Sequence, residues 1–163
     1  MTVVASIENP VLLIEKIFAD AVVPTRAHET DSGLDLYAHS FKNWDGIVYS
    51  TDCVSLDNGD RLLVGTGVKA TVGPGYEIQI RPRSGLALKQ GLTVLNAPGT
   101  VDEQYRGEIS VIIVNHSRSI KKITKGDRIA QMVVCPVILL EPTLVEKLPS
   151  TERDAGGFGS SGV

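Results

Sequence analysis

The segment Arg81-Pro-Arg-Ser-Gly85 places two guanidinium groups and a hydroxyl at the start of Ser84–Gln90, which has the composition of a short helix. The first N–H groups of a helix have no intrahelical partner and lie at the positive end of its dipole, so they attract anions. The guanidinium of Arg83 and the hydroxyl of Ser84 suit phosphate oxygens. The segment therefore indicates a phosphate site, although taken alone it also fits a capped helix flanked by surface arginines.

A second segment, Asn96-Ala-Pro-Gly-Thr-Val-Asp-Glu-Gln-Tyr-Arg-Gly-Glu108, combines a turn signal with a carboxylate and an aromatic ring. A tight hairpin there would expose backbone donors and acceptors that could read the edge of a planar base. Asp102 could act as a general base on a water molecule, and Tyr105 could stack beneath a sugar. The alternative is a hairpin with a solvated Asp102 and a tyrosine in the core.

Two further segments carry polar groups inside otherwise apolar runs. In Gly126-Asp-Arg-Ile-Ala-Gln131 a turn precedes a predicted strand, and in Asp31-Ser-Gly-Leu-Asp-Leu-Tyr-Ala38 a carboxylate, Asp35, has apolar neighbours. A buried carboxylate requires a partner. A site for a ligand would supply one, and so would a structural hydrogen bond.

The C-terminal segment, Arg153-Asp-Ala-Gly-Gly-Phe-Gly-Ser-Ser-Gly-Val163, cannot build a core because it is rich in glycine and serine and has a single aromatic residue, Phe158. Such a composition is typical of disorder. The presence of Arg153 and Phe158 argues against a simple linker and favours a segment that orders when something binds.

Several classes of function have no support in the sequence. It contains no glycine-rich phosphate loop, no dinucleotide fingerprint and no nucleophile elbow. The histidines, His28, His39 and His116, are too scattered for a zinc site. A net charge of −3 gives no global basic field for nucleic acid, so we expect no direct nucleic-acid partner.

The elements that must position these residues are mostly short strands. Alternation in Tyr76–Ile80 predicts a half-buried strand, and the β-branched runs Ile109–Val114 and Gln131–Val134 predict buried strands. Leu62–Val64 and Val68–Ala70 also read as extended. Turn signals separate these runs at Asp57-Asn-Gly59, Val72-Gly-Pro-Gly75, Ala97-Pro-Gly99 and Lys125-Gly-Asp127. This pattern predicts an all-β sandwich, jelly roll or barrel with one short helix at Ser84–Gln90, in which Ser84 lies near the N-cap and Gly91 ends the helix.

The length of 163 residues predicts one core domain. From about Glu141 the chain turns polar and then glycine-rich, which predicts an arm beyond the barrel. The two cysteines, Cys53 and Cys135, have no metal or redox spacing and are expected to be free thiols in a reducing compartment such as the cytoplasm. We expect no signal peptide, because the apolar run Val11–Ile14 is short, and no membrane-spanning segment.

Taken together, five segments resemble the five ordered motifs of the trimeric dUTPase family. The resemblance covers about residues 24–162, and five motifs in order are far more specific than any one of them. The matching segments are Gly33-Leu-Asp-Leu-Tyr-Ala38, Pro82-Arg-Ser-Gly-Leu-Ala87, Gly99-Thr-Val-Asp-Glu-Gln-Tyr-Arg-Gly-Glu108, Gly126-Asp-Arg-Ile-Ala-Gln-Met132 and Arg153-Asp-Ala-Gly-Gly-Phe-Gly-Ser160.

The resemblance implies a jelly-roll-like β-barrel over residues 1–148, with residues 149–163 as a flexible arm that closes over an active site. It implies a homotrimer with active sites shared between subunits. It also implies hydrolysis of dUTP to dUMP and pyrophosphate, which limits uracil incorporation into DNA and supplies dUMP for dTMP synthesis. The implied cofactor is Mg²⁺, held by substrate phosphates and waters rather than directly by protein ligands.

The resemblance also implies a role for each matching residue. Asp102 would be the general base, Tyr105 would pack against deoxyribose, and the backbone near Asn96 and Gly99 would read uracil. The groups expected to hold the phosphate chain are Arg83, Ser84, Gly85 and Gln131. Asp35 would support the site near the hydration shell of the metal. In the arm, Arg153 would clamp the terminal phosphate and Phe158 would cover uracil.

Two features depart from the family pattern. Asp154 occupies a position where the family usually has glycine; because aspartate tolerates positive φ better than most residues, we expect the turn to survive. The stretch Ser40–Ser50 is longer than the usual connection and carries the only tryptophan, which fits an exposed hairpin or a partner-binding loop, and we favour the hairpin.

Two rival functions remain at this stage. A dCTP deaminase-like enzyme of the same fold is disfavoured by Tyr105 and by the Gly-Gly-Phe-Gly arm. A regulatory protein without turnover would be expected to have a degraded site, whereas Asp102, Tyr105, Arg83 and Gln131 are all present.

Overall fold

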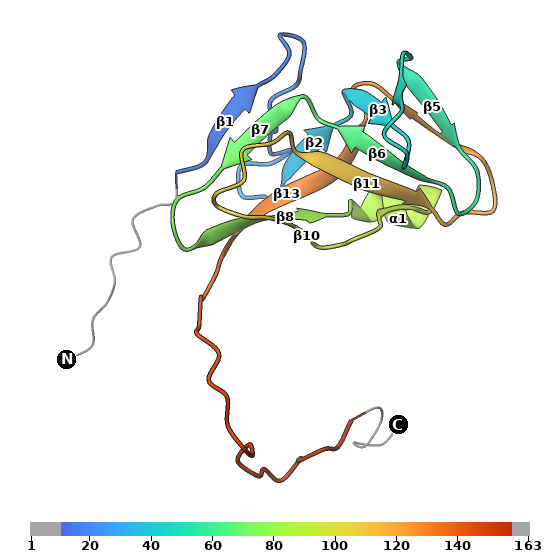
Figure 1. The fold of residues 1–163 in the computed structure, drawn as a ribbon. Helices are drawn as coiled ribbons and strands as arrows, with labels where there is room; N and C mark the ends of the chain where they lie inside the picture. Colours follow the sequence, from blue (N-terminus) through green and yellow to red (C-terminus); the bar gives the residue numbers. More distant parts are fainter. Residues whose placement is uncertain (1–10, 158–163) are drawn as a thin grey trace.

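The computed structural model describes residues 11–157 and has an all-β architecture with one short helix (Figure 1). The strands and the helix are, in order, β1 Leu13–Lys16, β2 Leu34–Tyr37, β3 Ser40–Lys42, β4 Val48–Tyr49, β5 Cys53–Leu56, β6 Arg61–Gly65, β7 Val68–Thr71, β8 Tyr76–Arg81, α1 Ser84–Gln90, β9 Leu92–Val94, β10 Gly99–Val101, β11 Ser110–Asn115, β12 Lys121–Thr124 and β13 Arg128–Pro136.

Two antiparallel sheets form the body of the molecule. One has the strand order β10-β8-β13-β2 and the other β4-β3-β6-β11-β9, while β1-β7 and β12-β5 form two-stranded sheets. Non-consecutive strands lie side by side in both large sheets, as in jelly-roll-like folds. The predicted fold class is thereby confirmed.

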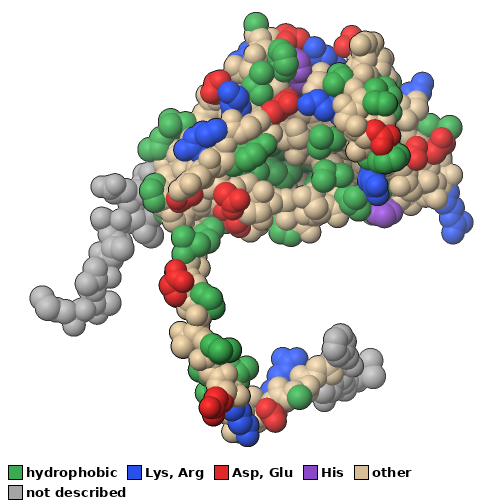
Figure 2. All heavy atoms as spheres, in the orientation of Figure 1, with side chains coloured by type: hydrophobic (Ala, Val, Ile, Leu, Met, Phe, Trp, Pro, Cys, Tyr) green, Lys and Arg blue, Asp and Glu red, His purple; other side chains and the backbone are tan. Residues whose placement is uncertain are grey.

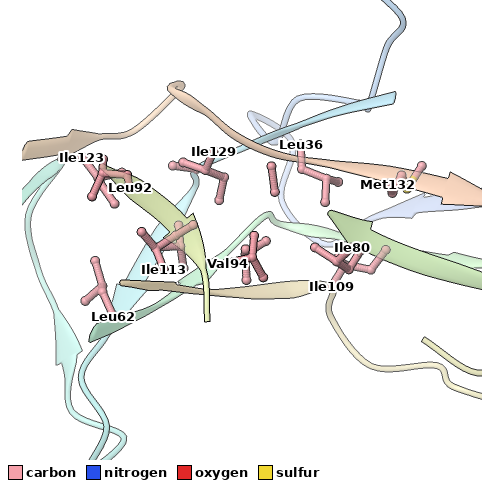
Figure 3. Close-up of a cluster of buried hydrophobic side chains, with 14 of the residues drawn as sticks. Leu36, Leu62, Ile80, Leu92, Val94, Ile109, Ile113, Ile123, Ile129 and Met132 are labelled. Atoms are coloured by element: carbon pink, nitrogen blue, oxygen red, sulfur yellow. The ribbon is translucent and has the colours of Figure 1, made fainter. Parts of the chain in front are cut away.

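Alternating side chains explain how these strands form one core. In β8, Ile78 and Ile80 are buried whereas Gln79 and Arg81 between and after them are only partly covered. Figure 3 shows buried side chains from both large sheets pointing toward one another, among them Leu36, Ile80 and Met132 from one sheet and Leu62 and Ile113 from the other. Hydrophobic burial between the sheets thus fixes which face of each strand remains available for polar groups.

The helix α1 has the predicted bounds. Arg83 is the N-cap residue, with extended backbone and no side-chain cap hydrogen bond, and Ser84, predicted to lie near the N-cap, is the first helical residue. Pro82 disfavours a helical backbone at Arg81, the residue before it. Gly91 ends the helix as predicted, in the left-handed conformation with φ 67°. No residue of α1 is buried, so the helix lies on the outside of the body.

The stretch Ser40–Ser50 forms a hairpin of β3 and β4. The Asn43 side-chain oxygen accepts hydrogen bonds from the backbone N–H groups of Asp45 and Ile47 at 3.0 and 2.8 Å, which closes the turn. Trp44 lies at the tip and is 72% exposed. The hairpin predicted for this stretch is therefore present, with an exposed apolar tip.

After β13 the chain leaves the body as an extended arm. The Val137 N–H donates to Gly75 O at 2.8 Å, and from residue 138 to residue 157 the chain forms no strand or helix. Figure 2 shows hydrophobic side chains along this arm. Ile138, Leu140 and Leu144 are each more than 80% exposed. Within residues 11–157, no helix is long and apolar enough to cross a membrane. Cys53 and Cys135 are free thiols.

Candidate active site

Five of the predicted site residues line one hollow of about 330 Å³, which we call the phosphate hollow. They come from three segments that are distant in the sequence: β2, the start of α1, and β13. The lining residues are Ala27, His28, Asp31, Ser32, Gly33, Asp35, Arg83, Ser84, Gly85 and Gln131. The fold therefore gathers the parts expected to hold a phosphate chain.

Asp35 is the centre of the charge network in this hollow. Its side chain is only 13% exposed, and its two oxygens accept separate hydrogen bonds, from Arg83 Nε at 2.9 Å and from Arg128 Nη1 at 3.1 Å. Such a pairing offsets the cost of removing a carboxylate from water. Asp35 thus orients two guanidinium groups, of which only Arg83 was anticipated from the sequence.

Gln131 lies beside Asp35 because β13 pairs with β2 in a register that places the two residues opposite each other. Its amide Nε2 donates to Pro82 O at 3.0 Å, which ties β13 to the segment just before α1. A side chain at position 33 would collide with the Gln131 amide, so Gly33 is required by this close approach.

Asp102 and Tyr105 line a different hollow, of about 250 Å³, which we call the nucleoside hollow. The other residues that line it are Thr100, Val101, Glu108, Ile109 and Ser110. Asp102 is exposed, and its backbone oxygen accepts a hydrogen bond from the Tyr105 N–H at 3.0 Å. The Tyr105 hydroxyl donates to Glu108 O at 3.1 Å, which holds the ring against its own loop. Tyr105 is therefore a surface residue at this hollow rather than a core tyrosine.

Asn96 lies in the turn that joins β9 to β10, and Gly99 is the first residue of β10. Gly99 is buried, and a Cβ there would approach the Asn96 amide nitrogen at 3.2 Å and Ile80 Cβ at 3.4 Å. Asn96 to Pro98 are exposed, so the backbone of the turn borders solvent. The tight hairpin predicted here is not formed, because β9 pairs with β11 and β10 pairs with β8, in two different sheets.

Arg153 lies in the arm, away from both hollows. Its Nε donates to Gly156 O at 2.9 Å, and the Gly156 N–H donates to Arg153 O at 2.8 Å, so the two residues close a local turn. Asp154 within this turn has a positive φ of 41°, which confirms that the turn survives without glycine. Phe158 lies outside the described residues.

Sequence reasoning missed three polar residues of this region. Arg128 is paired with Asp35, while His28 and Asp31 line the phosphate hollow. Arg128 could have been anticipated from its position three residues before Gln131, beyond a turn. For His28 and Asp31 the available signal was their closeness in sequence to Asp35.

A family model described as dUTPase matches residues 19–162. The chain belongs to the dUTPase family. The family expected from the five motifs is thus confirmed, and the match includes the arm as well as the body.

Individual dUTPases resemble the chain over most of its length. The deoxyuridine 5'-triphosphate nucleotidohydrolase of Crocosphaera subtropica is 49% identical over 150 residues, which is 92% of this chain and 97% of that protein. The enzyme of the same name from Clostridium acetobutylicum is 44% identical over 152 residues, which is 93% of this chain and 97% of that protein.

Among solved structures, a variant of the Staphylococcus bacteriophage 80alpha dUTPase with dUpNHpp has a similar fold. The TM-score is 0.78 at 26% identity, over 94% of this chain and 99% of the phage chain. The jelly-roll-like body is therefore that of the dUTPase family.

Proposed function

We propose that this chain hydrolyses dUTP to dUMP and pyrophosphate by attack of a water molecule on the α-phosphorus. The bacterial relatives carry the name of this activity. The observation on this chain that carries the proposal is the phosphate hollow, in which Asp35 holds two guanidinium groups beside Ser84, Gly85 and Gln131. That hollow offers a charged fork, a hydroxyl and an amide to a chain of phosphate groups.

In this mechanism the nucleoside hollow supplies the base and the sugar contact. Asp102 takes a proton from the attacking water, which requires an exposed carboxylate with room for a solvent molecule, as observed. Tyr105 packs against deoxyribose and leaves no room for a 2′-hydroxyl, and the backbone near Asn96 and Gly99 reads uracil. These roles rest on the family motifs and on the exposed positions of Asp102, Tyr105 and Asn96.

Mg²⁺ is proposed as the cofactor, and the donor set fits an ion that arrives with the substrate. Both oxygens of Asp35 already accept guanidinium hydrogen bonds. Residues 11–157 contain no group of three or more His, Cys, Asp or Glu side chains placed to hold a metal. Mg²⁺ keeps several waters and usually binds substrate phosphates, so no protein cage is needed. When bound, it would offset the charge of the phosphate chain.

We further propose that the complete site forms between subunits of a homotrimer, with residues 1–148 as the body and 149–163 as a closing arm. Two observations support this. Asp102 and Tyr105 line a different hollow from Arg83, so each chain offers two parts of a site. In addition, Leu139, Leu140 and Leu144 in the arm are more than 80% exposed, and apolar surface of this kind is typical of contact regions. Arg153 would then reach the terminal phosphate and Phe158 the base.

The deciding experiment is a pyrophosphate-release assay with dUTP, dCTP, dTTP and UTP in the presence of Mg²⁺. We expect release from dUTP with strong selectivity over the other three nucleotides. No release from dUTP would refute the proposal, and release of ammonia from dCTP would instead support the deaminase alternative.

Replacing the proposed base tests the mechanism directly. Asp102→Asn removes the proton acceptor but keeps the side-chain shape, so dUTP should still bind while turnover falls by about 10²–10⁴-fold. Single-turnover hydrolysis and equilibrium binding of dUpNHpp separate the two effects. Near-normal turnover would remove Asp102 from the role of base.

A further inference from the structure

His28 lies on the wall of the phosphate hollow, and none of the roles described so far uses it. It lines the same hollow as Arg83, Ser84 and Gln131. Its side chain is 83% exposed, so the ring adds nothing to the hydrophobic core. An exposed imidazole on the wall of a site for a polyanion is a candidate ligand for that anion.

The loop holds the imidazole in a defined orientation. The Asp31 carboxylate oxygen Oδ2 accepts hydrogen bonds from the His28 backbone N–H at 2.9 Å and from its ring Nδ1 at 3.2 Å. The Asp31 N–H donates back to His28 O at 3.0 Å, and Arg26 Nε donates to Asp31 O at 2.8 Å. With Nδ1–H directed at the carboxylate, Nε2 is the ring atom left for a ligand, the arrangement by which carboxylates also orient metal-binding histidines.

The charges of the hollow leave room for another cation. The carboxylates of Asp31 and Asp35 offset the guanidiniums of Arg83 and Arg128, so these four groups together carry no excess positive charge. The hydrogen bond from the His28 backbone keeps the pKa of the Asp31 carboxyl below its usual range, so that carboxyl stays ionised. Besides the proposed Mg²⁺ and Arg153, a protonated imidazole on the wall would add positive charge beside the phosphates.

We propose that His28 binds a phosphate oxygen of the nucleotide through Nε2–H, with Asp31 as the residue that positions its ring. The inference rests on the proposed function, because it takes the hollow to hold the phosphate chain. It adds a binding residue, and a residue that positions it, to the groups from the five motifs.

A binding experiment tests the contact without reference to turnover. The probe is magnesium tripolyphosphate, added to the uniformly ¹⁵N-labelled full chain, with NMR detection of the histidine-ring and arginine side-chain nitrogens. We expect the Nε2 resonance of His28 to shift in a saturable manner while that of exposed His116, which does not line the hollow, stays in place. Saturable shifts at Arg83 side-chain resonances with none at His28 would overturn the proposal.

Steady-state kinetics test whether the proposed His28 contact contributes to binding of dUTP. His28→Gln should raise KM for dUTP about threefold to tenfold with little change in kcat, because a partly exposed charge-assisted hydrogen bond is lost. His28→Lys should recover most of the loss. His116→Gln is the matched control.

Asp31→Asn tests the positioning role. It keeps an oxygen that can accept the backbone N–H, but it removes the carboxylate from the ring. It should raise KM in the natural protein and have no further effect in the His28→Gln background. Equal effects in both backgrounds, with an unchanged melting temperature, would show that Asp31 acts independently of the ring. If dUTP is not hydrolysed at all, the proposed function fails; if it is hydrolysed with unchanged KM in His28→Gln, only the present inference fails.

Discussion

At the scale of single residues, the position of the Tyr105 ring in the nucleoside hollow depends on Gly107, which has no side chain. A Cβ at position 107 would collide with the hydroxyl end of the Tyr105 ring. The ring lies along the backbone of its own loop, where its hydroxyl reaches Glu108 O. The glycine is thus needed for space rather than for an unusual backbone angle.

Gly107→Ala should therefore affect binding more than folding. The colliding atoms belong to the end of an exposed side chain, so the ring can move aside and the melting temperature should change by no more than about 2 °C. If Tyr105 packs against deoxyribose as proposed, displacing its ring should raise KM for dUTP about tenfold or more. Thermal unfolding and steady-state kinetics check both parts, with Gly73→Ala as a control because a Cβ there meets nothing within 4 Å. An unchanged KM would mean that the observed ring position is not the productive one.

At the scale of elements, an exposed carboxylate joins the loop after β1 to the turn before β13. Asp20 accepts hydrogen bonds from Lys125 Nζ at 2.7 Å and from His39 Nε2 at 3.1 Å. The His39 ring stacks on Phe18, with ring centroids 4.6 Å apart. The same turn continues through Gly126, whose N–H donates to Ala38 O at 2.7 Å. This contact, which we call the brace, thus stabilises the turn that leads to Arg128.

The brace should make stability depend on pH. The Lys125 hydrogen bond, followed by that of His39, holds the pKa of Asp20 well below its usual range. A lowered pKa in the folded state stabilises the protein above the pKa of the unfolded chain, near pH 4, and the contribution is lost as the pH falls further.

Asp20→Asn should accordingly lower the melting temperature by about 1–3 °C at pH 7. The difference from the natural protein should shrink as the pH falls from 5 toward 2. Asp45→Asn, in the exposed hairpin, should show no such trend. A difference that stays constant with pH would mean that the charge of Asp20 does not contribute to the brace.

The strands and the helix can be predicted from local sequence signals, but the assembly of the site cannot. Alternation around Ile78 and Ile80 predicts β8, and Gly91 predicts the end of α1, because each signal acts within a few residues. Asp35 required a partner, yet its partners are 48 and 93 residues away. Their meeting depends on strand register, including an irregularity between Arg128 and Ala130 that no local pattern encodes.

At the scale of the whole molecule, body and arm differ in what holds them in place. The body has a continuous core between its two large sheets, whereas Leu144 in the arm is 98% exposed and Leu148 is 76% exposed. The arm segment 138–157 therefore adds nothing to the core that fixes the body.

Ending the chain after Pro149 should leave the body folded, with a melting temperature within about 2 °C of the full chain. Turnover of dUTP should fall at least about tenfold, because the truncation removes the arm residues proposed to contact the phosphates and the base. Circular dichroism and pyrophosphate release measure the two outcomes. Retained activity would show that the arm does not act as a closing segment.

The placement of Asp102 and Arg83 in separate hollows has a genetic consequence. If each working site takes Asp102 from one chain and Arg83 from another, two inactive variants can together form active sites in a mixed assembly. Chains with Asp102→Asn and chains with Arg83→Ala, unfolded, mixed equally and refolded, should assemble with about a quarter of their sites intact. Activity that appears only in the refolded mixture would reveal this exchange; none would appear if each chain built its own site. Two defective copies of the gene would then complement in one cell.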